Sequence, residues 1–105
     1  MGAMTIEEWR QVAEALVVWS SEGSSPYPRR NPAAVLERYG QTEGTRLLTI
    51  IQQLERDYFS CTARNYAMTL DELRRIAKEE FVAKYPDLPV EGLKVLDWCY
   101  SYDNR

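Results

Sequence analysis

Two stretches of this chain, TIEEWRQVA at residues 5–13 and TLDELRRIA at residues 69–77, carry the same residue pattern for a helix start. Each begins with a threonine and places a glutamate three residues later, at Glu8 and Glu72. In a capping box the threonine hydroxyl accepts a hydrogen bond from the glutamate N–H, and the glutamate carboxylate accepts one from the threonine N–H. Apolar residues then recur at intervals of three and four. The two stretches therefore predict two amphipathic helices with defined starts.

Turn residues and further apolar periodicity predict the other helices. The first capping box opens a helix over residues 6–20, and the segment SEGSSPYPRRN interrupts it with proline, glycine and serine. Asn31 is a good N-cap and Pro32 suits the first helical position, so a short helix should follow and end at Gly40. The remaining predicted helices cover residues 43–59, 70–85 and 90–100.

These elements predict an all-α fold: a small single-domain bundle or irregular array of four to five helices. The length of 105 residues suits one domain, which we place at residues 4–105. We interpret Met1-Gly2-Ala3 as a cloning remnant, with Met4 as the natural start. Residues 60–68 have no clean period and are predicted to be a connection.

Two alternatives stay open at this level. Residues 96–103 alternate between apolar or aromatic and polar types, a pattern that is typical of a strand, so a strand competes there with the end of the last helix. The similarity of residues 5–13 to residues 69–77 also fits a degenerate duplication of a helical hairpin. Shared requirements of any capped amphipathic helix explain that similarity more simply.

The charge and composition exclude several classes of protein. The net charge of −3 and the pI near 5.0 argue against a general nucleic-acid binder, which needs a basic face. No apolar run approaches the roughly 20 residues of a membrane span, and the start does not resemble a secretory signal. We therefore expect a cytoplasmic protein in which Cys61 and Cys99 are free thiols.

The sequence offers little for catalysis. It contains no histidine, which removes the common nucleophile–base pairs and histidine metal sites, and it has no glycine-rich phosphate loop. We expect a protein that is not an enzyme and that has no catalytic residues, no cofactor and no metal. A small enzyme that uses Glu, Arg and Tyr side chains is the second alternative.

The strongest candidate for a binding surface is the segment DWCYSYD at residues 97–103, which combines aromatic rings with acids. Tyrosine and tryptophan dominate binding hot spots, and acids attract a basic partner. A core needs only Tyr100 and one of the other two rings, which leaves a large ring near solvent. The Arg29-Arg30 pair in the proline-rich loop is the second candidate. The predicted partner-binding residues are Asp97, Trp98, Tyr102, Asp103, Arg29 and Arg30.

From these observations the sequence predicts a non-catalytic protein that binds and inhibits another protein. The concrete version is a bacterial immunity protein that neutralises a cognate toxin by occluding a basic surface, a hypothesis that rests on analogy with small acidic helical inhibitors. The first alternative is an accessory protein that contacts nucleic acid through Arg29, Arg30 and Arg64. Arg74 and Arg75 are expected to be neutralised by Glu79 and Glu80 one turn later.

Overall fold

The computed structural model describes residues 4–21, 24–63 and 69–104. Within these ranges the chain forms five α-helices and no strand, which confirms the predicted all-α fold class. The helices are α1 (Ile6–Ser20), α2 (Pro32–Tyr39), α3 (Gln41–Phe59), α5 (Leu70–Lys84) and α6 (Val90–Asp103).

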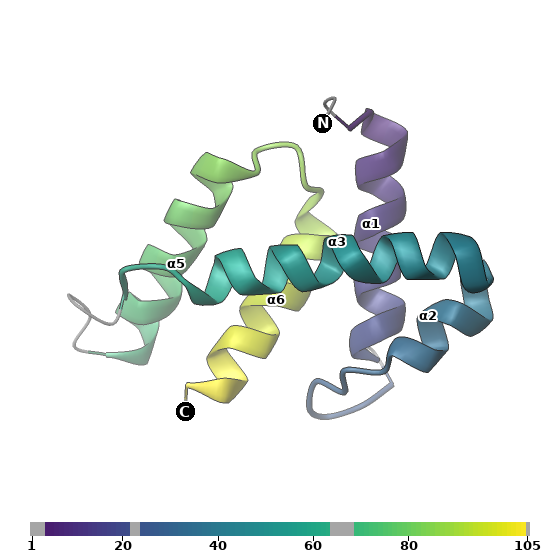
Figure 1. Ribbon diagram of the computed structural model, residues 1–105. Helices are drawn as coiled ribbons and strands as arrows, with labels where there is room; N and C mark the ends of the chain where they lie inside the picture. The colour runs from purple at the N-terminus through teal and green to yellow at the C-terminus, as the bar shows by residue number, and fades with distance from the viewer. Residues whose placement is uncertain (1–3, 22–23, 64–68, 105) are drawn as a thin grey trace.

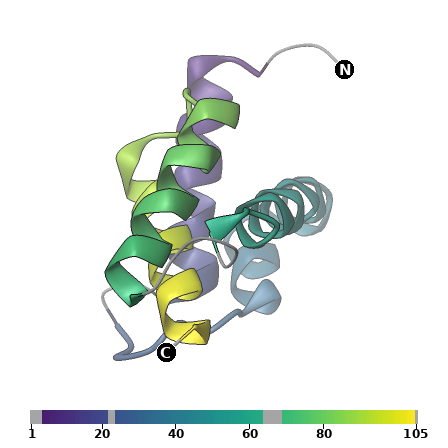
Figure 2. The same ribbon diagram turned by 90° about the vertical axis from the view of Figure 1, so that its left-hand side faces the viewer.

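Three of the helices form a layer that the fourth long helix crosses. The last helix, α6, lies between α1 and α5, and α3 runs across one face of this layer (Figure 1). The short helix α2 packs beside α3 and also contacts α1. Figure 2 shows α3 nearly end-on at one side of the layer, with no described helix on the other side. The core therefore lies between α3 and the layer.

Three helices begin with the N-caps that the sequence predicted. Thr5 Oγ1 accepts a hydrogen bond from Glu8 N at 3.1 Å, and Thr5 N donates to Glu8 Oε1 at 3.2 Å, so the first capping box is complete. Thr69 Oγ1 accepts from Glu72 N at 3.1 Å at the start of α5. The Asn31 side chain accepts a hydrogen bond from the first turn of α2. These side chains satisfy backbone N–H groups that have no partner inside the helix.

Two glycines serve different roles at the points where helices meet. Gly40 separates α2 from α3 and has a φ of 87°, a conformation that residues with a Cβ rarely adopt. Because the chain turns at this single residue, α3 begins at Gln41, two residues before the predicted start. A Cβ on Gly92 of α6 would lie only 3.2 Å from Ala13 Cα of α1. The missing side chain thus lets these two helices approach closely.

The strand alternative for residues 96–103 is wrong, because α6 continues through Asp103, three residues beyond the predicted helix end. Trp98 is half-buried, Tyr100 is buried and Tyr102 is exposed. Residues two apart on a helix point about 200° apart. Aromatic residues on two sides of one helix therefore imitate the alternation of a strand.

Aromatic rings join the helices inside the core. The Tyr58 ring of α3 lies 4.9 Å from Phe81 of α5 and 5.4 Å from Tyr100 of α6, measured between centroids. Phe59 lies 5.1 Å from Tyr100. Such pairs contribute about 0.5–1.5 kcal/mol each beyond the burial of their area. The end of α6 is thereby fixed against α3.

Candidate functional site

The loop between α1 and α2 is held against the end of α1 by its backbone. Arg29 N donates to Ser20 O at 2.9 Å, and Asn31 N donates to Trp19 O at 2.8 Å. Pro28, directly before Arg29, is buried. These contacts fix the direction in which the side chains of Arg29 and Arg30 leave the loop. Figure 1 shows that this loop and the end of α6 lie at the same end of the molecule.

Arg30 joins three parts of the chain. Its Nε donates to Glu55 Oε2 of α3 at 2.6 Å, and its Nη2 donates to Asp103 Oδ2 of α6 at 2.7 Å. The guanidinium carbon also lies 6.0 Å from the Trp19 ring and 5.9 Å from the Phe59 ring. Burial acts to lower the pKa of Arg30, but the hydrogen bonds to the two carboxylates outweigh it and raise the pKa. Arg30 is therefore a fixed positive charge in a defined position.

Two tyrosines from distant segments meet beside Arg30. The rings of Tyr27 and Tyr102 have centroids 6.3 Å apart, and the two residues remain 43% and 39% exposed. Arg29 lies over the Tyr27 ring at 5.7 Å. Exposed rings of this size cost little entropy to immobilise, so they suit a binding surface. Four predicted site residues are thus brought together: Arg29, Arg30, Tyr102 and Asp103.

An open groove of about 540 Å³ adjoins these residues and extends onto α3. Phe59 supplies an apolar part of its wall, and Arg56 carries a charge that makes no ion pair within the described residues. We call the combined surface the Tyr27–Tyr102 face. Its residues are Tyr27, Arg29, Arg30, Gln52, Glu55, Arg56, Phe59, Tyr102 and Asp103.

The other two predicted site residues lie elsewhere, in the contact between α5 and α6. The Asp97 carboxylate is only 9% exposed and accepts two hydrogen bonds from Arg74, at 3.2 and 2.8 Å. Lys78 Nζ lies 3.7 Å from it. Asp97 is thus not the exposed rim acid that the sequence suggested, because cations from α5 neutralise it. Trp98 is half-buried beside a separate hollow of about 350 Å³.

The basic residues of α5 are neutralised only partly as expected. Arg75 pairs with Glu79 at 3.1 Å, as the spacing predicted. Arg74 turns to Asp97 instead, and Glu80 accepts hydrogen bonds from Thr62. Both arrangements leave little free positive charge on this helix.

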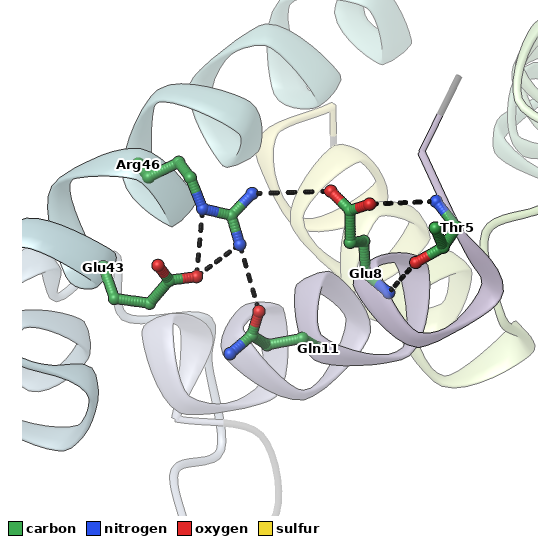
Figure 3. Close-up of polar contacts among 5 residues, drawn as sticks. All are labelled: Thr5, Glu8, Gln11, Glu43 and Arg46. Atoms are coloured by element: carbon green, nitrogen blue, oxygen red, sulfur yellow. Dashed lines mark hydrogen bonds and ion pairs between the residues drawn. The ribbon is translucent and has the colours of Figure 1, made fainter. Parts of the chain in front are cut away.

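A second arginine cluster connects α1 with α3 and is shown in Figure 3. Arg46 of α3 donates to Glu43 in its own helix and to Gln11 of α1 at 3.0 Å. Its Nη1 lies 4.0 Å from Glu8 Oε2, whose other oxygen accepts from Thr5 N. The capping box of α1 is thereby tied to α3. We call this cluster the Arg46 network: Thr5, Glu8, Gln11, Glu43 and Arg46.

Sequence reasoning missed five contributors to the Tyr27–Tyr102 face, namely Tyr27, Gln52, Glu55, Arg56 and Phe59. Tyr27 stands in the proline-rich loop next to the predicted arginines, so its position could have identified it. Glu55 and Phe59 lie on α3, where nothing in the sequence indicates that the end of α6 packs nearby. Arg64, the third arginine of the nucleic-acid hypothesis, lies outside the described residues.

Within residues 4–21, 24–63 and 69–104, no group of three or more Cys, Asp or Glu side chains is arranged to hold a metal ion. None of the described helices combines the length and the apolar character that crossing a bilayer requires. Cys61 and Cys99 are both free thiols, and Cys61 Sγ lies 3.3 Å from Tyr100 Oη. Comparisons with protein-family models, with curated protein sequences and with solved structures found no significant match to this chain.

Proposed function

We propose that this chain is a non-catalytic protein that binds another protein through the Tyr27–Tyr102 face. One observation carries the proposal. Two segments that the sequence suggested independently as contact surfaces, and that lie 73 residues apart at Arg30 and Asp103, meet in a single exposed surface. Tyrosine and arginine are among the residue types that dominate binding hot spots, and this face presents both: Arg30 and Arg56 line the groove, and Tyr27 and Tyr102 belong to the two segments that meet at Arg30 and Asp103.

Rigidity of the face supports the same proposal. Arg30 is held by two carboxylates and lies between two rings, and Tyr27 and Tyr102 contact each other. A partner would therefore not have to immobilise these side chains, which reduces the entropic cost of binding.

The specific form that we propose is an inhibitor, such as an immunity protein that covers the working surface of a toxin. The overall charge of −3 supports attraction of a basic partner at long range. The face itself carries both signs, with Arg29, Arg30 and Arg56 beside Glu55 and Asp103. At contact distance, the partner should therefore present charges of both signs around an apolar centre.

The nucleic-acid alternative receives less support. Arg30 is already paired with two carboxylates, so it offers less positive potential to phosphate groups than an unpaired arginine would. Catalysis is also not part of the proposal: the groove has Glu55 and Asp103 among its lining residues, but Arg30 engages both carboxylates in ion pairs.

The test is capture of partners from native cells, followed by measured affinity of one purified partner for matched variants. Tyr102→Ala should weaken binding by about thirtyfold or more, the effect of losing about 2 kcal/mol at a central anchor. Val82→Ala on α5 is the control, because Val82 is similarly exposed but lies on a different helix from the face. Equal affinity of both variants and the parent would refute the proposal. If the partner is a toxin, stoichiometric loss of its activity would establish the inhibitory form.

A further inference from the structure

We infer that the Tyr27–Tyr102 face also binds a second copy of this chain, so that the protein forms a two-fold symmetric dimer. The inference rests on the proposed function in one respect: it takes this face to be a surface that binds protein. In a two-fold interface the same patch occupies both sides, so every feature of the patch must find its complement within the patch itself. The question is therefore which surface of the molecule is self-complementary.

The shape of the face meets this condition. The exposed rings of Tyr27 and Tyr102 are not among the residues that line the groove, but they belong to the same two segments as Arg30 and Asp103, whose side chains do line it. A two-fold axis between rings and groove would place the rings of each copy against the groove of the other. The Phe59 ring in the groove gives the incoming tyrosines an aromatic contact.

The charges of the face also meet the condition of self-complementarity. Arg29 makes no ion pair within the described residues and lies on the side of the rings. The carboxylates of Glu55 and Asp103 lie on the side of the groove and remain 25% and 36% exposed. In the symmetric arrangement each Arg29 would approach the carboxylates of the other copy. A two-fold contact places each end of the patch opposite the other end of its copy, so opposite charges at the two ends can pair.

The hollow beside Trp98 shows the contrast. Its ionic side chains are mainly basic, since Arg74 and Lys94 line it and Lys78 lies near the buried Asp97. The one acid that lines this hollow, Asp97, is already engaged by Arg74 and Lys78, so a second copy would find no exposed carboxylate among the lining residues to pair with its cations. Of these two hollows, the Tyr27–Tyr102 face is therefore the better site for a second copy.

The size of the face sets the expected strength. A standard interface buries roughly 800 Å² on each partner, which would be about an eighth of the 6537 Å² accessible surface of this chain. The Tyr27–Tyr102 face comprises nine residues, fewer than the roughly 20–30 that a standard interface has on each side. We expect a dimer that dissociates in the micromolar range rather than a permanent one.

Sedimentation equilibrium of the purified protein, from about 1 to about 500 µM, tests this directly over the expected range. The expected result is a monomer–dimer equilibrium that Tyr102→Lys weakens at least thirtyfold and that Arg29→Glu weakens severalfold. Val90→Lys and Lys94→Glu are the matched controls on α6: each introduces the same charge change as one test variant, at an exposed position away from the face. Both controls should leave the equilibrium within about twofold of the parent.

Three results would overturn the inference. They are a parent protein that stays monomeric at every concentration, growth into open-ended oligomers, and a dimer that the controls weaken as much as the test variants. Circular dichroism of each variant shows whether it is folded, and Arg29→Glu changes only an exposed side chain. A monomeric protein whose partner binding is still lost in Tyr102→Ala would overturn the dimer and leave the proposed function standing. If the protein forms the dimer but Tyr102→Ala binds the partner as tightly as the parent does, the dimer stands and the proposed function is refuted.

Discussion

Arg30 and Arg46 look alike in isolation and differ in what they connect. Each is about one-third exposed, and each donates hydrogen bonds to more than one acidic or amide side chain. The main partner of Arg46 is Glu43, three residues earlier in the same helix, which spacing alone predicts. Arg30 instead bonds to carboxylates 25 and 73 residues away and lies near two rings.

The comparison separates two uses of the same side chain. The Arg46 network reinforces a helix start and one helix–helix contact, both of which exist without it. Arg30 connects the loop between α1 and α2 with Glu55 of α3 and with the end of α6, and so creates a surface that no single element could form. If this distinction is right, equal substitutions at the two positions should have unequal effects.

The largest difference should appear in stability. Arg30→Met keeps the aliphatic stem but removes two ion pairs and two ring contacts, and should lower the free energy of unfolding by about 1–3 kcal/mol. Arg46→Met should cost about 0.5 kcal/mol, because its main pair is local and exposed. Urea denaturation of both variants measures this. Equal losses would mean that the long-range connection of Arg30 contributes nothing beyond an ordinary surface pair.

The reactivity of Cys99 offers a local version of this test. Burial raises the pKa of the Cys99 thiol to about 12, so in the native state the thiol should react only when the structure opens. Arg30→Met should increase its alkylation rate by about five- to a hundredfold, the kinetic equivalent of 1–3 kcal/mol if opening is local. Arg46→Met should leave the rate nearly unchanged. Half-buried Cys61 should react in all variants and serves as the internal reference.

Loss of the helix cap tests the other cluster. Thr5→Ala removes the hydroxyl that accepts a hydrogen bond from Glu8 N and should cost about 0.5–2 kcal/mol, the usual value of an N-cap. Thr69→Ala removes the corresponding cap of α5 and should cost a similar amount. If denaturant melts show that only Thr5→Ala is costly, Arg46 strengthens the first cap more than its 4.0 Å contact with Glu8 suggests.

Coupling energies should sharpen the comparison further. A double-mutant cycle between Arg30 and Asp103, with Met and Asn as replacements, should give about 0.5–1 kcal/mol, because the pair is short and partly protected from water. The same cycle between Arg46 and Glu8 should give nearly zero at 4.0 Å. Coupling energies of equal size in both cycles would contradict the expectation that Arg30 interacts more strongly with Asp103 than Arg46 does with Glu8.

Acidification should affect the Arg46 network weakly and in a defined direction. The hydrogen bond from Arg46 lowers the pKa of Glu43 below its ordinary value of 4.5. The resulting stability is fully present above pH 4.5 and is lost as the pH falls through the lower, folded-state pKa. Glu43→Gln should therefore show a slightly smaller loss of stability than the parent protein on acidification below pH 4.5. A steeper loss in the variant would mean that folding does not lower the pKa of Glu43.

The helices were predictable because their signals are local. The capping threonines, the Asn31-Pro32 start and the glycine at residue 40 each act within one turn of the chain, and each marks a helix boundary as expected. The last helix was ambiguous because its aromatic residues serve two surfaces. Tyr100 enters the core while Tyr102 faces outward, so the apolar pattern has no single side.

The candidate site was only half predictable, because only part of it depends on local signals. Tyr102 and Arg29 are identified by residue type and by neighbouring turn residues. The burial of Asp97 could not be foreseen, because Arg74 and Lys78 surround it only after α5 packs on α6. The convergence of Arg30 with Asp103 depends on the layer of α1, α6 and α5, which nothing in either local segment encodes.

The contact between Arg30 and Asp103 also sets an order of events during synthesis. Residues 6–59 can form helical turns while the rest of the chain is still being made, since helices form within about a microsecond and synthesis adds about 5–20 residues each second. The ion pair between Arg30 and Asp103, however, can form only after α6 has been synthesised and has packed against α1. The Tyr27–Tyr102 face is therefore complete only in a folded chain, so any molecule that recognised this face would distinguish folded from partly folded chains.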